Sequence, residues 1–169
     1  QWNTTNGTAA NRVLLYVNGV QVTSFSTQVT ASSSEQSEWN KAQSNQIGRY
    51  AFNGTSYFDC YMTEINFIDG QALTPSSFGQ FNATTGVWQP IAYTGTYGTN
   101  GFHLNFSNGT STTTLGYDSS GNSNNWTTNN ISLTAGSTYD WMIDSPTPYQ
   151  GSSYGVGNYC VLNPLDAGS

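Results

Sequence analysis

The chain has 169 residues, and its 3 Lys and Arg residues against 9 Asp and Glu residues give a net charge of -6. This balance argues against nucleic acid and anionic membrane surfaces as partners, because both require clustered basic side chains. Aromatic residues make up 14 % of the sequence and charged residues only 7 %, and this composition favours strands and turns over helices. No apolar run reaches the about 20 residues that a membrane-spanning helix needs.

The first predicted element is a β-hairpin over residues 12–25. Asn18-Gly19 separates two runs rich in β-branched and aliphatic residues, and an Asn-Gly pair suits the two positive φ angles of a type I′ turn. Residues 26–45 form a polar connection that contains Trp39. This side chain either anchors the loop on the core or, if it is exposed, offers its flat apolar face to a sugar ring.

Residues 46–50 and 57–68 are predicted to be the central strands, joined by an Asn53-Gly54 turn. Large apolar side chains occur on both faces of the second segment, which is typical of a strand buried between two layers. These side chains are Tyr57, Phe58, Tyr61, Met62, Ile65, Phe67 and Ile68. An Asp69-Gly70 turn follows, and then a short helical turn that Thr74 can cap and Pro75 can begin.

Residues 80–90 are predicted to form a loop that ends in Val87-Trp88, followed by strands over residues 91–97 and 101–106. The second of these strands has Phe102, Leu104 and Phe106 on one face and His103 on the other. Further along, residues 131–133 and 139–143 are short strand candidates. From residue 144 the sequence is rich in Pro, Gly and Ser, and it predicts a strap or linker.

The very polar stretch 107–130 contains one candidate metal site. Asp118 and Asn122 place a carboxylate and an amide in a glycine-containing loop, and Ca²⁺ prefers oxygen ligands of these kinds. The alternative is an Asx turn held by the same two side chains. No other cofactor is expected.

Catalysis is not expected from the residue pattern. The single histidine, His103, is interpreted as a strand-surface residue without a catalytic triad around it. A glycosidase needs two carboxylates about 5 to 10 Å apart, and Glu64 has no acidic neighbour on its strand face. We therefore predict that the protein is not an enzyme, with a jelly-roll glycan lyase or hydrolase as the alternative.

Five sequence segments carry a family resemblance: RVLLYVNGVQV, QIGRYAFNGTSYFDCYMTEINFIDGQALTPSSFG, GVWQPIAYTGTYGTNGFHLNFSN, LGYDSSGNSNNWTTNNISLTAG and DSPTPY. They resemble bacteriophage virion and tail-fibre-type proteins, many from marine phages, which carry concanavalin A-like (laminin G-like) jelly-roll domains. The resemblance spans about residues 11–165. It implies an all-β jelly-roll β-sandwich with a loop-rich C-terminal extension, and it supplies no catalytic residues.

The resemblance also implies a division of the chain. Residues 1–90 resemble the closing half of the sandwich, and residues 91–169 are expected to be a strand-and-loop extension with a C-terminal strap. The strands that precede the closing half in the family are missing. The chain is then a fragment of a longer protein, or a neighbouring subunit adds strands; a permuted sandwich completed by the residues after 95 is the weaker alternative.

The two cysteines are Cys60, in the predicted central strand, and Cys160, in the predicted strap. In the family that the chain resembles, Gly often replaces the first Cys and Ala the second. We predict a Cys60–Cys160 disulfide that pins the strap onto the sandwich and closes a large loop. The alternative is two buried free thiols.

The resemblance implies a non-catalytic virion structural protein at the virion surface or another extracellular location. Such a tail-fibre, head-fibre or decoration component would form a homo-oligomer, contact other virion subunits and attach to cell-surface glycans. Two alternatives stay open: a secreted carbohydrate-binding, lectin-like module, and a subunit of an extracellular filament assembled by strand exchange. The candidates for stacking on a glycan are Trp39, Trp88, Tyr93 and Trp126.

Overall fold

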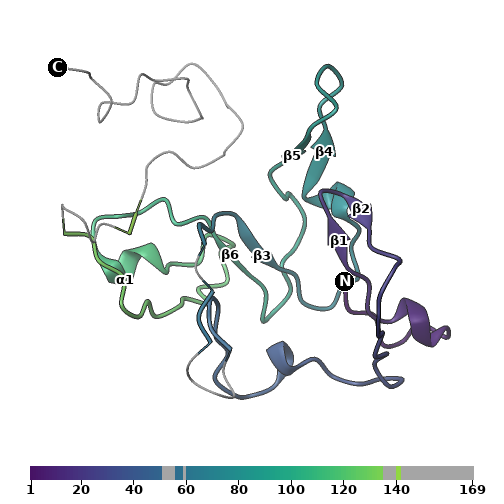
Figure 1. Ribbon diagram of the computed structural model, residues 1–169. Coiled ribbons are helices and arrows are strands. Elements are labelled where there is room, and N and C mark those ends of the chain that lie inside the picture. Colours follow the sequence, from purple (N-terminus) through teal and green to yellow (C-terminus); the bar gives the residue numbers. More distant parts are fainter. Residues whose placement is uncertain (51–55, 59, 135–139, 142–169) are drawn as a thin grey trace.

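The computed structural model of the chain describes residues 1–50, 56–58, 60–134, 140 and 141 (Figure 1). Within these residues, short strands form three two-stranded antiparallel sheets, and very little helix is present. The chain therefore belongs to the all-β class, as its composition predicts. The elements are η1 (Ala9–Asn11), β1 (Tyr16–Val17), β2 (Val20–Gln21), η2 (Glu38–Asn40), β3 (Ile65–Phe67), η3 (Pro75–Ser77), β4 (Gly79–Phe81), β5 (Trp88–Pro90), β6 (Phe102–Leu104) and α1 (Thr112–Leu115).

The predicted hairpin at Asn18-Gly19 is confirmed. β1 pairs with β2, and the φ angles of Asn18 (48°) and Gly19 (79°) are both positive, as a type I′ turn requires. The hairpin is shorter than predicted, because the chain before β1 has another partner. Leu14 N donates to Gln1 O at 3.0 Å, so the N-terminal residues occupy the place where a longer second strand would pair.

The sheet formed by β3 and β6 lies at the centre of the molecule (Figure 1). Phe67 is opposite Phe102, and Asn66 is opposite His103. Because side chains alternate along a strand, the aromatic pair lies on one face of the sheet and the polar pair on the other. Phe102 and Leu104 on the apolar face are only 4 % and 2 % exposed, which confirms the predicted apolar face for these two residues. The strand is shorter than the predicted 101–106, because β6 ends at Leu104 and Phe106 has a φ of +53°. This sheet also joins residues 1–90 to residues 91–169.

Residues 80–90 form a hairpin instead of the predicted loop. β4 and β5 pair in register, with Phe81 opposite Trp88, and the turn that connects them projects from the molecule (Figure 1). The connection is closed by Asn82, whose Oδ1 accepts hydrogen bonds from Thr84 N and Thr85 N, both at 2.9 Å. Two three-residue strands around a polar turn give too short an alternation to stand out in the sequence.

The predicted burial of residues 57–62 is wrong. Phe58 is 70 % exposed and Tyr61 is 92 % exposed, although the sequence predicts a strand covered on both faces. Pairing explains the difference: Tyr57 forms one isolated bridge with Arg49, and the extended backbone is interrupted at Glu64, whose φ is +52°. The strand proper begins only at Ile65. The predicted Asn53-Gly54 turn lies outside the described residues.

Two further strand predictions are wrong. Residues 91–97 make single backbone bonds rather than a ladder: Ile91 N donates to Phe78 O at 2.9 Å, whereas Tyr97 O accepts from Asp69 N at 2.8 Å. Residues 131–133 are likewise not a strand. Of the strand candidate 139–143 only residues 140 and 141 are described, and the strap from residue 144 lies outside the described residues.

The short helices agree only in part with prediction. The turn that Pro75 begins is confirmed, but Thr74 makes no capping hydrogen bond to it. No element was predicted for the very polar stretch 107–130, and α1 forms there because Ser111 and Thr114 make a reciprocal capping box. In the part of the chain that the structure describes, no helix has the length and apolar character to cross a membrane.

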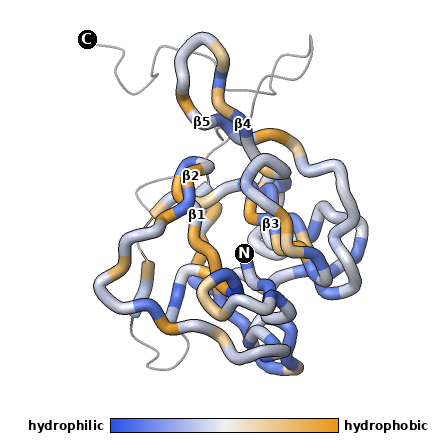
Figure 2. Tube along the Cα trace, turned by 90° about the vertical axis from the view of Figure 1, so that its right-hand side faces the viewer, coloured by the Kyte–Doolittle hydropathy of each residue, from blue (hydrophilic) through white to orange (hydrophobic). Residues whose placement is uncertain are grey.

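The core of the described chain is small. Its buried hydrophobic residues are Ala31, Phe102, Leu104 and Leu115. Figure 2 shows why a larger core does not form: the hydrophobic stretches at β1, β2 and β3 are short and are separated by hydrophilic chain. The β3–β6 sheet is therefore the best-covered part of the described fold, and it positions the candidate site.

Candidate functional site

An aromatic cluster covers the apolar face of the β3–β6 sheet. It consists of Phe67 and Phe102 from the strands, with ring centroids 5.6 Å apart, and of Trp39 and Trp126 from distant loops. Trp39 lies 5.8 Å from Phe67 and 5.9 Å from Trp126, and Trp126 lies 5.0 Å from Phe102. These separations fall in the range of about 4.5 to 7 Å over which aromatic rings attract one another.

Trp39 is both an anchor and a surface residue. It is the middle residue of the 3-10 turn η2, and its contacts with the cluster confirm that it fastens the 26–45 connection to the core. Nevertheless, 40 % of Trp39 remains exposed. Its indole is therefore held in place by packing while part of it faces solvent.

A closed ring of hydrogen bonds, which we call the amide ring, adjoins the cluster. Asn40 Nδ2 donates to Asp69 Oδ1 at 2.8 Å, Asn100 N donates to Asp69 Oδ2 at 3.1 Å, and Asn100 Nδ2 donates to Asn40 Oδ1 at 3.1 Å. Asp69 follows Phe67 by two residues, and Asn100 precedes Phe102 by two. The amide ring thus lies at the end of the same two strands that carry the cluster.

Asp118 organises the loop that follows α1. Its Oδ1 accepts from His103 N and Ser120 N, both at 2.8 Å, and its Oδ2 accepts from Ser120 Oγ at 2.8 Å and Asn124 N at 2.9 Å. Burial raises the pKa of the Asp118 carboxyl, but these hydrogen bonds outweigh burial and hold the pKa below its ordinary value. The bond from Ser120 N closes the Asx turn that was the alternative interpretation, and calcium binding stays a prediction.

Asn122 and Asn124 fasten this loop to the start of β6. Asn122 Nδ2 donates to Gly101 O at 2.9 Å, and Asn124 Nδ2 donates to the same oxygen at 2.9 Å. As a result, two of the predicted stacking residues and both predicted calcium ligands gather around residues 98–103. The sequence separates these residues by as many as 87 positions, from Trp39 to Trp126.

The other two stacking candidates lie elsewhere and are packed. A Cβ added to Gly19 or Gly79 would overlap the Trp88 ring, so this indole lies against both backbones and joins the β1–β2 turn to β4. A groove of about 550 Å³ runs beside it. Tyr93 packs on Phe78 with ring centroids 5.2 Å apart, and its hydroxyl donates to Thr96 O at 3.0 Å.

The polar face of the β3–β6 sheet carries a group that the sequence reasoning missed. His103 Nε2 lies 2.9 Å from Glu64 Oε2, and the imidazole stacks on the Tyr97 ring at 6.1 Å. His103 is thus on its strand as predicted, but its side chain is half-buried rather than on the surface. Burial, followed by the charge of Glu64, raises the pKa of Tyr97. The pair could have been found by pairing the two predicted strands in antiparallel register, because Asn66 opposite His103 brings residue 64 close to residue 103.

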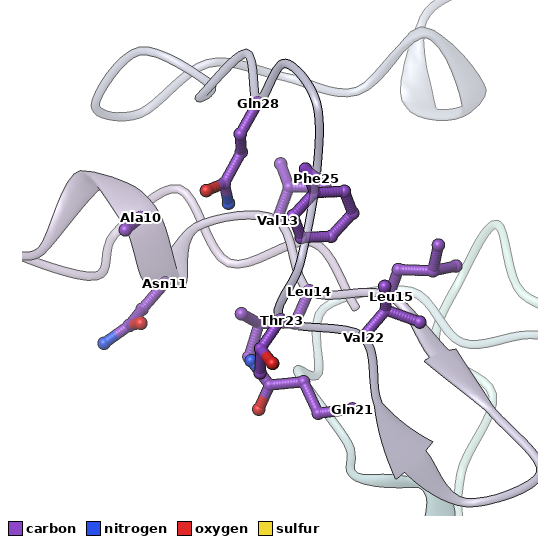
Figure 3. A pocket seen from close by; sticks show the side chains of 10 residues that line it. All are labelled: Ala10, Asn11, Val13, Leu14, Leu15, Gln21, Val22, Thr23, Phe25 and Gln28. Carbon is purple, nitrogen blue, oxygen red and sulfur yellow. The ribbon is translucent and has the colours of Figure 1, made fainter.

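A second cavity lies under the β1–β2 hairpin (Figure 3). It is lined mainly by apolar side chains that include Val13, Leu14, Val22 and Phe25. Its volume of about 140 Å³ is below the roughly 300 to 1,000 Å³ of small-molecule pockets. This cavity is therefore a packing gap rather than a ligand site.

Of the two predicted disulfide partners, Cys60 is exposed rather than buried in a central strand. Cys160 lies outside the described residues. The Cys60–Cys160 bridge stays a prediction.

Comparisons with protein-family models, with curated proteins and with solved structures returned no match to the chain. The function is therefore argued from the residues and their geometry.

Proposed function

We propose that the chain is a non-catalytic structural protein of a virion surface, as a tail-fibre, head-fibre or decoration component. The proposal assigns it a concanavalin A-like jelly-roll sandwich that becomes complete when the chain assembles with other subunits or with further copies of itself. The resemblance of its sequence to phage virion proteins supports the setting. The exposed apolar segment before β3 supports assembly.

That segment, the assembly segment, comprises Tyr57, Phe58, Tyr61 and Met62, all of which are exposed. Contiguous apolar surface on a soluble protein is typical of an interaction site. Two residues separate the segment from β3, which belongs to a two-stranded sheet, and open sheet edges accept further strands. This exposed run of large apolar side chains is the observation that carries the proposal.

The hydroxyl of Thr63 gives a second indication. Its Oγ1 is buried and has no hydrogen-bond partner among the described residues, and a buried hydroxyl without a partner costs about 1 to 3 kcal/mol. Thr63 lies between the assembly segment and β3. A strand docking there would cover the apolar side chains, and a local shift of the chain at Thr63 would let this hydroxyl bond to the strand.

Light scattering on the purified chain at several concentrations tests the proposal. We expect the wild type to form an oligomer and Tyr61→Asp to be monomeric, because a charge at this position opposes burial. Val29→Asp is the matched control, since Val29 is a similarly exposed apolar residue far from the segment in sequence. A monomeric wild type would contradict self-assembly of the chain, and an oligomer that Tyr61→Asp leaves intact would contradict assembly through this segment.

Two alternatives make different predictions in the same preparation. A filament built by strand exchange would grow without limit as the concentration rises, whereas a closed virion component has a fixed size. A secreted lectin-like module would bind glycans as a monomer, and the partial exposure of Trp39 favours testing it directly.

A further inference from the structure

We infer that Trp39 and the amide ring form a binding site for an uncharged glycan, with one pyranose ring on the indole and its hydroxyls on the amide ring. The inference adds glycan attachment to the proposed function and rests on that function only for its biological setting. The site would serve a virion protein and a secreted module equally. It is also separate from the assembly segment, so the two proposals can fail independently.

The apolar half of the site is the solvent-facing part of the Trp39 indole. Contacts with Phe67, Phe102 and Trp126 support the ring from below. Pyranose rings have an apolar C–H face, which is complementary to the flat surface of an aromatic ring. Because packing already fixes the indole, ligand binding would lose little side-chain entropy.

The polar half is the amide ring. Its three bonds use one Nδ2 hydrogen of each asparagine and Asn40 Oδ1, and Asn100 Oδ1 makes no hydrogen bond within the described residues. Each Nδ2 has a second hydrogen, and each carboxylate oxygen of Asp69 has a further lone pair. The ring therefore keeps donors and acceptors for neighbouring hydroxyls while its own geometry stays fixed.

The charges near the site favour an uncharged ligand. Lys41 contacts the Glu38 carboxylate, so the nearest cation is already paired, and Asp69 contributes a negative charge to the amide ring. The whole chain carries a net charge of -6. Sulfated or uronic-acid glycans would be repelled by this field, whereas a neutral polysaccharide pays no such cost.

Native affinity electrophoresis of the full chain tests the inference. The gels contain a neutral polysaccharide, namely β-glucan, galactomannan, xylan or agarose-derived galactan, and an alginate gel is the acidic comparison. We expect retardation in at least one neutral gel and none in alginate. Trp39→Leu should weaken that retardation by at least about tenfold, as truncation of a central aromatic contact does, and Asn100→Ala by several-fold.

Phe81→Ala is the control, because Phe81 is an exposed aromatic residue outside the site, and it should leave retardation unchanged. Asn100 is exposed, so its variant keeps the test decisive even if Trp39→Leu lowers stability, which thermal melting would reveal. Unchanged retardation in Trp39→Leu and Asn100→Ala would overturn the site. Migration unaffected by every neutral gel would overturn glycan binding, and light scattering would still report on assembly separately.

Discussion

Residues 57–62 and residues 65–67 are adjacent and similarly apolar, yet they have opposite environments. β3 pairs with β6 and is partly covered by Trp39, whereas the assembly segment has one isolated bridge and exposed aromatic side chains. The change occurs at Glu64, where φ is positive. Pairing and cover, rather than hydrophobicity, decide which part of this apolar run is shielded from solvent: β3 is half-buried and residues 57, 58, 61 and 62 are exposed.

The comparison also separates two kinds of surface. In the β3–β6 region the exposed part of Trp39 is rigidly supported, as a recognition site requires. Around the assembly segment the described residues provide no second layer behind the side chains, which suits a surface that is itself buried on association. Variants on either side of Glu64 should therefore affect different properties.

The largest expected effect is on folding. Phe102→Ala removes the centre of the aromatic cluster and should lower the free energy of unfolding by about 3 to 5 kcal/mol. Tyr61→Ala, in the exposed segment, should change it by no more than about 0.5 kcal/mol. Urea denaturation of both variants, under conditions that keep the chain monomeric, measures the difference. Equal losses would show that the assembly segment is part of the folded core of the isolated chain.

A smaller effect is expected from the polar support of β6. Asp118→Asn replaces one carboxylate oxygen with an NH₂ group, so donors such as Asn124 N can lose their acceptor. We expect the free energy of unfolding to fall by about 1.5 to 3 kcal/mol. The loss should depend on pH, since the folded-state pKa of Asp118 lies below its ordinary value of 3.8. The carboxylate therefore stabilises the fold above that value, and its contribution disappears as the pH falls through the folded-state pKa.

Thermal melting from pH 7 down to pH 2 measures this contribution. The wild type should lose stability below about pH 4, and Asp118→Asn should lack that part of the loss. A parallel acid transition in wild type and Asp118→Asn would contradict the role of this carboxylate.

Local signals in the sequence predicted local structure well. Asn18-Gly19 specifies its turn through the φ angles it allows, and Pro75 specifies the start of a short helix, so both were found. The β4–β5 hairpin was missed because its polar turn outweighs two very short strands. The burial of residues 57–62 was predicted wrongly. A run of apolar residues indicates that a segment can be buried, but it does not indicate whether a partner strand is present to cover it.

The site could be predicted only as separate parts. Indole chemistry marked Trp39 and Trp126, and oxygen chemistry marked Asp118 and Asn122. The sequence pattern did not indicate that these four residues lie in one region of the fold, because the course of the loops between residues 39 and 126 determines their positions. The amide ring was not foreseen, since Asn40, Asp69 and Asn100 are ordinary residues in a chain rich in Asn. The β3–β6 register is what brings them together.

The smallest expected effect lies at the boundary between the covered and the open region. Thr63→Val removes a buried hydroxyl that has no partner within the described part of the chain, so the isolated chain should be unchanged or stabilised by up to about 1 kcal/mol. Thr4→Val is the matched control: Thr4 is also buried, but its Oγ1 donates to Glu35 O at 2.9 Å, and its loss should cost about 1 kcal/mol.

The same Thr63→Val variant also bears on assembly. If a docking strand supplies a partner for Thr63 Oγ1, the variant should weaken the oligomer while sparing the monomer, and the dissociation constant from light scattering should rise a few-fold. A loss of monomer stability equal to that of Thr4→Val would mean that the hydroxyl is already bonded in the isolated chain. Thr63 would then need no hydrogen-bond partner from a docking strand, and the assembly segment would have to be covered by side-chain contacts alone.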